Sequence, residues 1–574
     1  MPTATRYFAY WRKFFCLQAQ DFLPIGEKRI GRHIVRLWTA HRPLLPCGAP
    51  RTRWPEGGGS IFIRACGIIN ECVLRYVNSM EKGQGTGTYN HILKYTSLFG
   101  GVQGLNLLIS LVRNKAVALL LGPSGMGLVS LFQTTVNFIS QATNLGISFS
   151  AVRNVSELFD TGDEERISHF IKVVRAWSML TGLVGMLLCI VIGPMLSSLT
   201  FSWGDHTLHF VLLSPLVFLL AVTGGETAIL KGARQLRSLA VIQVYSVIAA
   251  LVISLPIYYL FGQTGIVPVM VLMGLGTLLL TIRRSFRLYP LRLTGARILG
   301  EGMGMVRLGV AFTLAGVLGS GAEFVIRSYL NNVGDLKIVG LYNTGYLMTM
   351  TYAGLIFSAM ETDFFPRLSA VNSDVLRYND LINKQAEVSV LLISPVIVIA
   401  FYVLPIMVPL LASGEFLPVV DMMRFVALSL FLRAVNLPME YLSLAKGASS
   451  SYLFLESVYD VLMVVLVILG YQLWGLTGTG VAILAVTVLN TVLVISFVGC
   501  RFQVRLCPEL IRTLLIQMSI GMLAFYGSLK MSGIGYWLAG VVFGMLSLGV
   551  SVIILRRKTH LWEKLKDKML KRVK

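Results

Sequence analysis

The residues of this chain best placed to do chemistry are a few basic side chains inside long apolar runs. They are Arg113 and Lys115 in one run, with Arg327 and Arg433 in two others. A central charge costs about 2.5 to 3.5 kcal/mol on membrane-insertion scales, so such a residue normally faces a cavity or a partner. Because a guanidinium fork matches phosphate oxygens, we predict that these four side chains form a cationic pocket for an anionic headgroup.

Each cation also has a structural interpretation, which stays open. Arg327 follows Glu323 by four residues and could pair with it on one helix face. Arg433 precedes Glu440 by seven residues, which again places both on one face. Arg113 and Lys115 could extend their side chains toward the membrane surface instead.

Four carboxylates inside apolar runs are candidates for coupling or gating: Glu226, Glu323, Glu440 and Asp460. Glu226 and Glu440 each stand before a Lys-Gly-Ala loop, and we favour a pairing of each carboxylate with the lysine of that loop. Asp460 is the candidate for carrying a proton, since it is a carboxylate within an apolar run.

The composition indicates which elements position these residues. Of 574 residues, 55% are hydrophobic and 14% are charged, whereas soluble domains carry about 25% charge. A membrane-spanning helix needs about 20 apolar residues. We therefore predict an all-α polytopic membrane protein with about fourteen spans, near 96–121, 127–148, 174–199, 208–230, 239–261, 265–282, 305–330, 338–360, 386–412, 421–443, 452–474, 476–499, 511–531 and 534–555.

The two halves of the chain match each other at an offset of about 214 residues. Arg113 matches Arg327, Arg153 matches Arg367, and one Lys-Gly-Ala loop matches the other. Such a period indicates two homologous six-helix lobes with two helices appended. An even number of spans per lobe gives parallel repeats, which predicts a substrate site between the lobes and alternating access. The predicted domains are an N-lobe at 80–300, a C-lobe at 301–505, and two spans with a basic tail at 506–574.

Residues 1–79 differ from the rest of the chain. They hold 12 Lys or Arg and 4 acids, with no apolar run long enough to span a membrane. We interpret them as a non-native extension upstream of Met80, or alternatively as a disordered basic arm.

Loop charges predict the topology. Twenty Lys or Arg residues fall in alternate loops, among them Arg175, while the opposite loops hold only Lys337 and Lys530. Positive loops stay in the cytoplasm, so both termini are predicted to be cytoplasmic. The net charge of +22 then reflects topology, and no nucleic-acid partner is expected.

Motifs for catalysis are missing from the sequence. The seven histidines are dispersed, with only His206 and His209 close together, and neither a CxxC pair nor a GxxxxGK[ST] phosphate loop occurs. We expect no enzyme activity, no metal and no cofactor.

The stretch Ser110–Leu128, with Asn144-Leu145-Gly146-Ile147 and Val152-Arg153, resembles Wzx-type polysaccharide flippases of the multidrug/oligosaccharidyl-lipid/polysaccharide exporter (MOP) superfamily, over about residues 95–500. The resemblance implies translocation of undecaprenyl-pyrophosphate-linked oligosaccharide units, such as O-antigen or enterobacterial common antigen, across the bacterial inner membrane. It also implies membrane lipid, a polysaccharide polymerase and a chain-length protein as partners.

Two relatives of the same fold are alternatives. The lipid II flippase shares an Arg at the position of Arg113, but its usual Arg-Asp pair is absent because Asn114 follows. A multidrug cation antiporter would favour acids in the cavity, whereas the first-helix cations here favour anionic cargo.

Overall fold

The structure is a computed structural model that describes residues 88–161, 163–201, 204–290, 302–351 and 367–558, together with residues 300, 354, 357, 364 and 365. The predictions for residues 1–79 and for the basic tail after 558 lie outside the described residues. Ile92–Lys574 forms one compact unit, and all contacts below lie within it.

Every element in this part of the chain is helical, which confirms the all-α prediction. The helices are α4 (Thr88–Thr143), α5 (Ile147–Thr161), α6 (Glu164–Val191), α7 (Gly193–Thr200), α8 (Thr207–Gly232), α9 (Leu236–Phe261), α10 (Ile266–Leu288), α12 (Met303–Val333), α13 (Leu336–Tyr346), α15 (Val375–Leu411), α16 (Val420–Ala445), α17 (Ser449–Phe502), α18 (Pro508–Lys530) and α19 (Gly533–Lys558). Short 3₁₀ or π turns lie at Gly262–Gly265, Leu347–Thr351 and Gly414–Val419.

Eight stretches of the described helices are long and apolar enough to cross a membrane, in agreement with a polytopic protein. Several of these stretches contain a break. In α17 the backbone leaves the helical region at Trp474 and Gly475, and Gly470 then contacts Gly478. Eight residues of straight helix would separate those glycines by about 12 Å, so the chain reverses there. The count of fourteen spans stays a prediction.

Helix α4 breaks at Gly122, where φ is +65°, and Pro123 follows. Glycine adopts this left-handed conformation without a steric cost. Proline has no N–H to continue the helical hydrogen bonds. The break divides α4 into a first segment that carries Arg113 and a second segment, residues 123–143.

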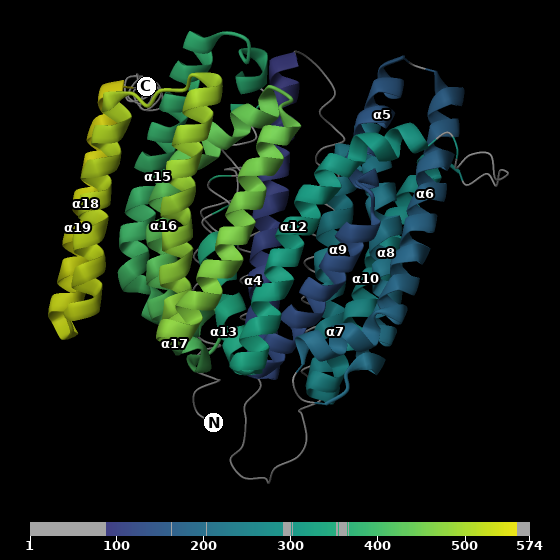
Figure 1. Ribbon diagram of the computed structural model, residues 1–574, viewed down its shortest axis with the longest axis horizontal. Coiled ribbons are helices and arrows are strands. Elements are labelled where there is room, and N and C mark those ends of the chain that lie inside the picture. The colour runs from purple at the N-terminus through teal and green to yellow at the C-terminus, as the bar shows by residue number, and fades with distance from the viewer. Residues whose placement is uncertain are drawn as a thin grey trace, which may run out of the picture. The chain divides into compact units, whose positions relative to one another are not determined.

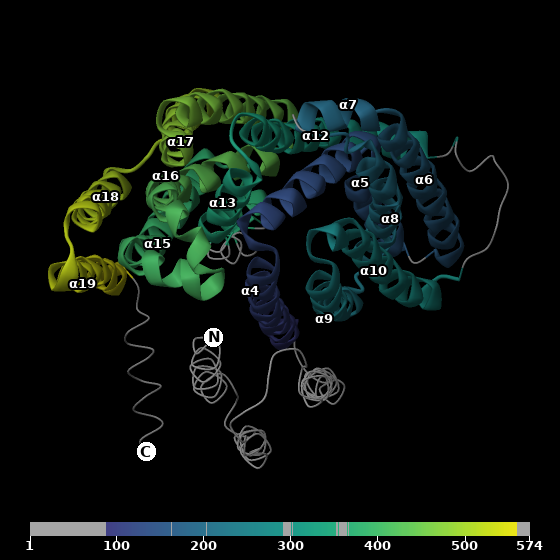
Figure 2. The same ribbon diagram turned by 90° about the horizontal axis from the view of Figure 1, so that it is seen from below.

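The helices form two groups that pack mainly among themselves (Figure 1). In the first group, α5, α6, α9 and α10 pack against α8; in the second, α15 and α17 pack against α16, with α18 and α19 on α15. Helix α7 packs on α6 and α8 and belongs to the first group, whereas α12, which packs mainly on α17, and α13 belong to the second. Helix α12 also contacts α5 and α7 of the first group (Figure 2). The predicted lobe boundaries at 300 and 505 stay a prediction.

Aromatic contacts fix the second segment of α4 between these groups. Phe132 packs on Phe201 and Phe210 of the first group, with ring centroids 5.9 and 5.8 Å apart. Phe138 stacks on Phe324 of α12 at 5.6 Å. Because buried aromatic rings contribute large apolar areas, these contacts hold α4 along two different faces.

Candidate functional site

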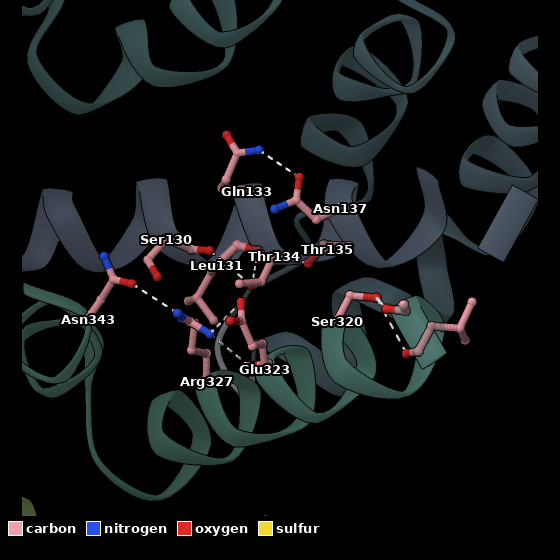
Figure 3. A network of polar contacts seen from close by, with 12 residues as sticks. Ser130, Leu131, Gln133, Thr134, Thr135, Asn137, Ser320, Glu323, Arg327 and Asn343 are labelled. Carbon is pink, nitrogen blue, oxygen red and sulfur yellow. Dashed lines mark hydrogen bonds and ion pairs between the residues drawn. The ribbon is translucent and has the colours of Figure 1, made fainter. Parts of the chain in front are cut away.

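Arg327 lies buried in α12, where two neighbours bind its guanidinium. Its Nη1 is 3.2 Å from Glu323 Oε2, and its Nη2 donates to Asn343 Oδ1 of α13 at 3.1 Å. Figure 3 shows this group facing Ser130 and Thr134 of α4. The structure thus places Arg327 where α12 meets α4, and it forms the Glu323 pair that the spacing of four residues predicts.

Arg113 has a different environment. Its Nε is buried and has no hydrogen-bond partner. Among the described residues, the titratable group that interacts electrostatically with its guanidinium is Tyr258 of α9, and no carboxylate pairs with it. Arg113 is therefore a partly buried cation that no protein acid neutralises within the described part of the chain.

Lys115 reaches the second helix group. Its Nζ donates to the carbonyl oxygen of Pro409 at 2.7 Å. Pro409 lies in the last turn of α15, whose final carbonyls have no partner within the helix. The Lys115 ammonium of α4 therefore caps the C-terminal end of α15 in the second group.

Arg433 and Glu440 share a helix face but bind different partners. Arg433 Nη1 donates a weak hydrogen bond to the sulfur of Met350, at 3.8 Å. Glu440 accepts a hydrogen bond from Asn490 Nδ2 at 3.0 Å. The guanidinium and the carboxylate interact through space.

Asp460 lies on α17 and is 9% exposed. Its Oδ2 is buried and has no hydrogen-bond partner, and the side chain lies opposite Gly319 of α12. An unpartnered buried carboxylate oxygen is costly unless a proton or cation compensates it.

The pairings favoured for Glu226 and Glu440 with the loop lysines are wrong. Glu226 forms a buried ion pair with Arg175 at 2.7 Å and also accepts a hydrogen bond from Ser285. Lys446, the lysine after Glu440, donates to the carbonyl of Asn372. Arg175 was predicted to be a loop cation, but it lies inside α6 and is 7% exposed. Its ion pair with Glu226 of the neighbouring helix α8 explains why Arg175 is buried there.

Further polar contacts join the groups at the end of the bundle where α4 breaks, which we call the Gly122 end. Asn331 Nδ2 donates to the carbonyl of Thr200, and Asn332 Nδ2 donates to the carbonyl of Leu199, both at 2.8 Å. These carbonyls end α7. Side chains of α12 and of α4 thus cap the ends of α7 and of α15, respectively.

The backbones also meet at the Gly122 end. A Cβ at Gly127 would overlap the carbonyl of Leu336, and a Cβ at Gly340 would overlap the carbonyl of Pro123. Both pairs of equivalent positions, 127 with 340 and 123 with 336, differ by 213 residues, close to the repeat offset. Repeat-related residues that touch one another lie on the axis relating the two repeats, as parallel repeats require.

A close backbone contact also lies at the other end of the second α4 segment. Gly146, with φ of +66°, lies against the backbone of Gly309 in α12. The two helix groups are therefore in contact at both ends of this segment.

No metal centre is evident in the described residues, where no three His, Cys, Asp or Glu side chains are grouped to hold an ion. His206 and His209 have ring centroids 5.2 Å apart and pack against Phe201 and Phe132.

Three amides of these contacts were not predicted from sequence: Asn331, Asn332 and Asn343. A separate amide pair on α4, Gln133 with Asn137, was not predicted either. The signal that could have found this pair is the spacing of two amides four residues apart inside an apolar run.

The fold defines a class of membrane transporter. A structure of the lipid II flippase MurJ in an inward closed conformation matches with a TM-score of 0.65 and 14% identity, over 80% of this chain and 99% of that chain. An inward-facing multidrug resistance MATE family transporter of the MOP superfamily matches with a TM-score of 0.58 and 17% identity, over 69% and 94%. A MOP superfamily transporter from Pyrococcus furiosus matches with a TM-score of 0.51 and 13% identity, over 74% and 94%. The chain therefore has the MOP-superfamily fold.

The chain belongs to the polysaccharide biosynthesis protein family, whose profile matches residues 116–421. No curated protein sequence matches it. The family match confirms the resemblance carried by Ser110–Leu128. Family and fold are those of transporters and flippases rather than of catalytic enzymes.

Proposed function

We propose that this protein is a flippase that moves polyprenyl-pyrophosphate-linked oligosaccharide units across the bacterial inner membrane by alternating access. The units are those of a surface polysaccharide such as O-antigen or enterobacterial common antigen, carried on undecaprenyl pyrophosphate. The observation that carries the proposal is Arg113, a partly buried cation in a candidate span that no acid pairs with among the described residues. Membership of the polysaccharide biosynthesis family supports the choice of cargo.

The cations would neutralise the pyrophosphate. A charge-assisted hydrogen bond between a guanidinium and a phosphate oxygen is about twice as strong as a neutral one. Arg113 can make such bonds without leaving a protein partner, whereas Arg327 would share its guanidinium with Glu323 and Asn343. Lys115 and Arg433 extend the positive potential along the pathway.

The carboxylates would couple the cycle to an ion. Asp460 and Glu440 are suited to this because no cation bonds to either carboxylate among the described contacts. A proton or cation at Asp460 would compensate its unpartnered oxygen. Replacing Asp460 by Asn should therefore remove most of the acceleration that an ion gradient gives, while transport without a gradient continues. Equal gradient dependence of D460N and wild type would reject this role.

In the cell, both termini would be cytoplasmic and the Gly122 end would face the periplasm, as the loop charges predict. Opening of that end would release the headgroup to the periplasmic leaflet, where a polysaccharide polymerase with its chain-length partner would consume it.

Reconstituted vesicles test the proposal. A fluorescent polyprenyl-pyrophosphate oligosaccharide in one leaflet should become accessible to a membrane-impermeant quencher from the other leaflet when the protein is present. Arg113→Ala should slow this about ten- to a hundredfold, the range for lost hydrogen bonds to a charged group. Arg153→Ala is the matched control, because Arg153 is exposed and pairs only with Glu157 within its own helix.

Each contrary outcome has a defined meaning. Transport of lipid II in preference to the oligosaccharide lipid would favour a peptidoglycan precursor flippase. Transport of organic cations with no lipid movement would favour a drug antiporter. Normal transport by R113A would refute the role of Arg113.

A further inference from the structure

Two amide side chains lie on an exposed face of α4 and have no role in the site described above. Gln133 Nε2 donates to Asn137 Oδ1 at 2.9 Å, and both side chains are exposed. They lie within the candidate span Gly104–Thr143. Exposing uncompensated amides to lipid would cost several kcal/mol, so this face requires water or a polar ligand.

The direction of the amide pair follows from the helix geometry. At about 100° per residue, the pair lies between Phe132, which packs on the first helix group, and Phe138, which packs on α12. The opposite side of the helix carries Leu131 and Thr135, which are fully buried. Figure 3 shows Gln133 and Asn137 on the side of α4 away from Arg327 and Glu323. The pair therefore faces the space between the two helix groups.

The chemistry of the pair suits hydroxyl groups. The bond between them leaves Gln133 Oε1 as an acceptor and the Asn137 amide N–H groups as donors. A hydroxyl both donates and accepts, so an amide pair can satisfy it completely. The hydrogen bond holds the two amides side by side, so that both can reach one sugar ring. An uncharged pair competes weakly with arginine for phosphate.

We propose that Gln133 and Asn137 bind the sugar hydroxyls of the cargo, while Arg113 binds its pyrophosphate. This inference rests on the proposed function and divides the headgroup between two parts of α4. Gln141, one turn further along and beside Gly316 of α12, continues the same exposed face.

Two lipid probes separate the two parts. One is a polyprenyl-pyrophosphate oligosaccharide, and the other is the same polyprenyl pyrophosphate without sugars. The double variant Gln133→Leu/Asn137→Leu should bind the glycosylated lipid about tenfold more weakly, as expected for two neutral hydrogen bonds. It should bind the bare lipid as the wild type does. Arg113→Ala should weaken binding of both.

Two further variants serve as controls. Thr135→Val changes a polar residue on the buried side of α4, where its hydroxyl donates to the carbonyl of Leu131, and it should leave the ratio of the two affinities unchanged. The exchange Gln133→Asn/Asn137→Gln keeps both amides and should retain most of the preference for the glycosylated lipid.

The inference is overturned if the double variant loses affinity for both lipids equally, since the pair would then be structural. It is also overturned if the variant binds the glycosylated lipid normally. Failure of the proposed function looks different, because the wild-type protein would then bind neither lipid.

Discussion

The two repeats hold equivalent charges, but their partners differ. In the first repeat the cation, Arg113, has no acidic partner among the described residues, whereas the carboxylate, Glu226, is paired with Arg175. In the second repeat the cation, Arg327, is paired with Glu323, whereas Glu440 accepts only a neutral hydrogen bond.

Single residues account for the difference. At the repeat offset of 214, the position of Glu323 corresponds to Ile109, and the position of Arg175 corresponds to Ser389. Each repeat therefore lacks the partner that the other has. The comparison teaches that, among the described residues, the first repeat leaves its cation without an ion-pair partner, while the second leaves its carboxylate without one.

The largest effect is expected on stability. Removing one member of the buried Arg175–Glu226 pair, as in Arg175→Ala, leaves an uncompensated charge and should cost about 3 to 5 kcal/mol. Both side chains are under 10% exposed. Glu440→Ala should cost much less, because Glu440 accepts a neutral hydrogen bond and interacts with Arg433 only through space. Thermal unfolding in detergent would measure both, and equal shifts would contradict the comparison.

A smaller effect, on ligand binding, is expected from giving Arg113 the acidic partner that Arg327 has. Ile109→Glu would place an acid four residues before Arg113, as Glu323 precedes Arg327. Binding of the bare polyprenyl pyrophosphate should weaken about tenfold, because the new charge repels the phosphate and neutralises the guanidinium.

Two further variants test the same idea, one as a control for size and one as the converse change of charge. Ile109→Gln controls for size and should have little effect. Glu323→Gln should strengthen binding about two- to fivefold, a modest gain because Glu323 is about half exposed. No change in either charge variant would mean that the arginines do not contact phosphate.

The smallest effect concerns the helix caps at the Gly122 end. Asn331→Ala removes one hydrogen bond between the groups, worth about 1 kcal/mol, and should increase opening of that end about fivefold. Thiol labelling of Thr200→Cys, whose side chain is fully buried in this structure, would measure opening. Asn379→Ala, whose amide bonds lie at the opposite end of α15, should leave the labelling rate unchanged.

Part of this arrangement was predictable from sequence. Apolar runs and composition predicted an all-helical membrane protein, and the spacing of Glu323 and Arg327 predicted their pair, since both signals are local. The pair of Arg175 with Glu226 spans 51 residues and depends on how α6 and α8 pack, so loop counting misplaced Arg175. The bond from Lys115 to Pro409 spans 294 residues and joins a side chain to a backbone carbonyl, which carries no residue-specific signal.

The contact between Gly127 and Gly340 constrains both repeats at the same position. The two backbones touch there, and a side chain at either glycine would displace the backbone of the other repeat. The close backbone approach therefore calls for glycine at the equivalent position of both repeats. The two repeats are therefore alike where their backbones touch, whereas the ion-pair partners of their equivalent charged residues differ.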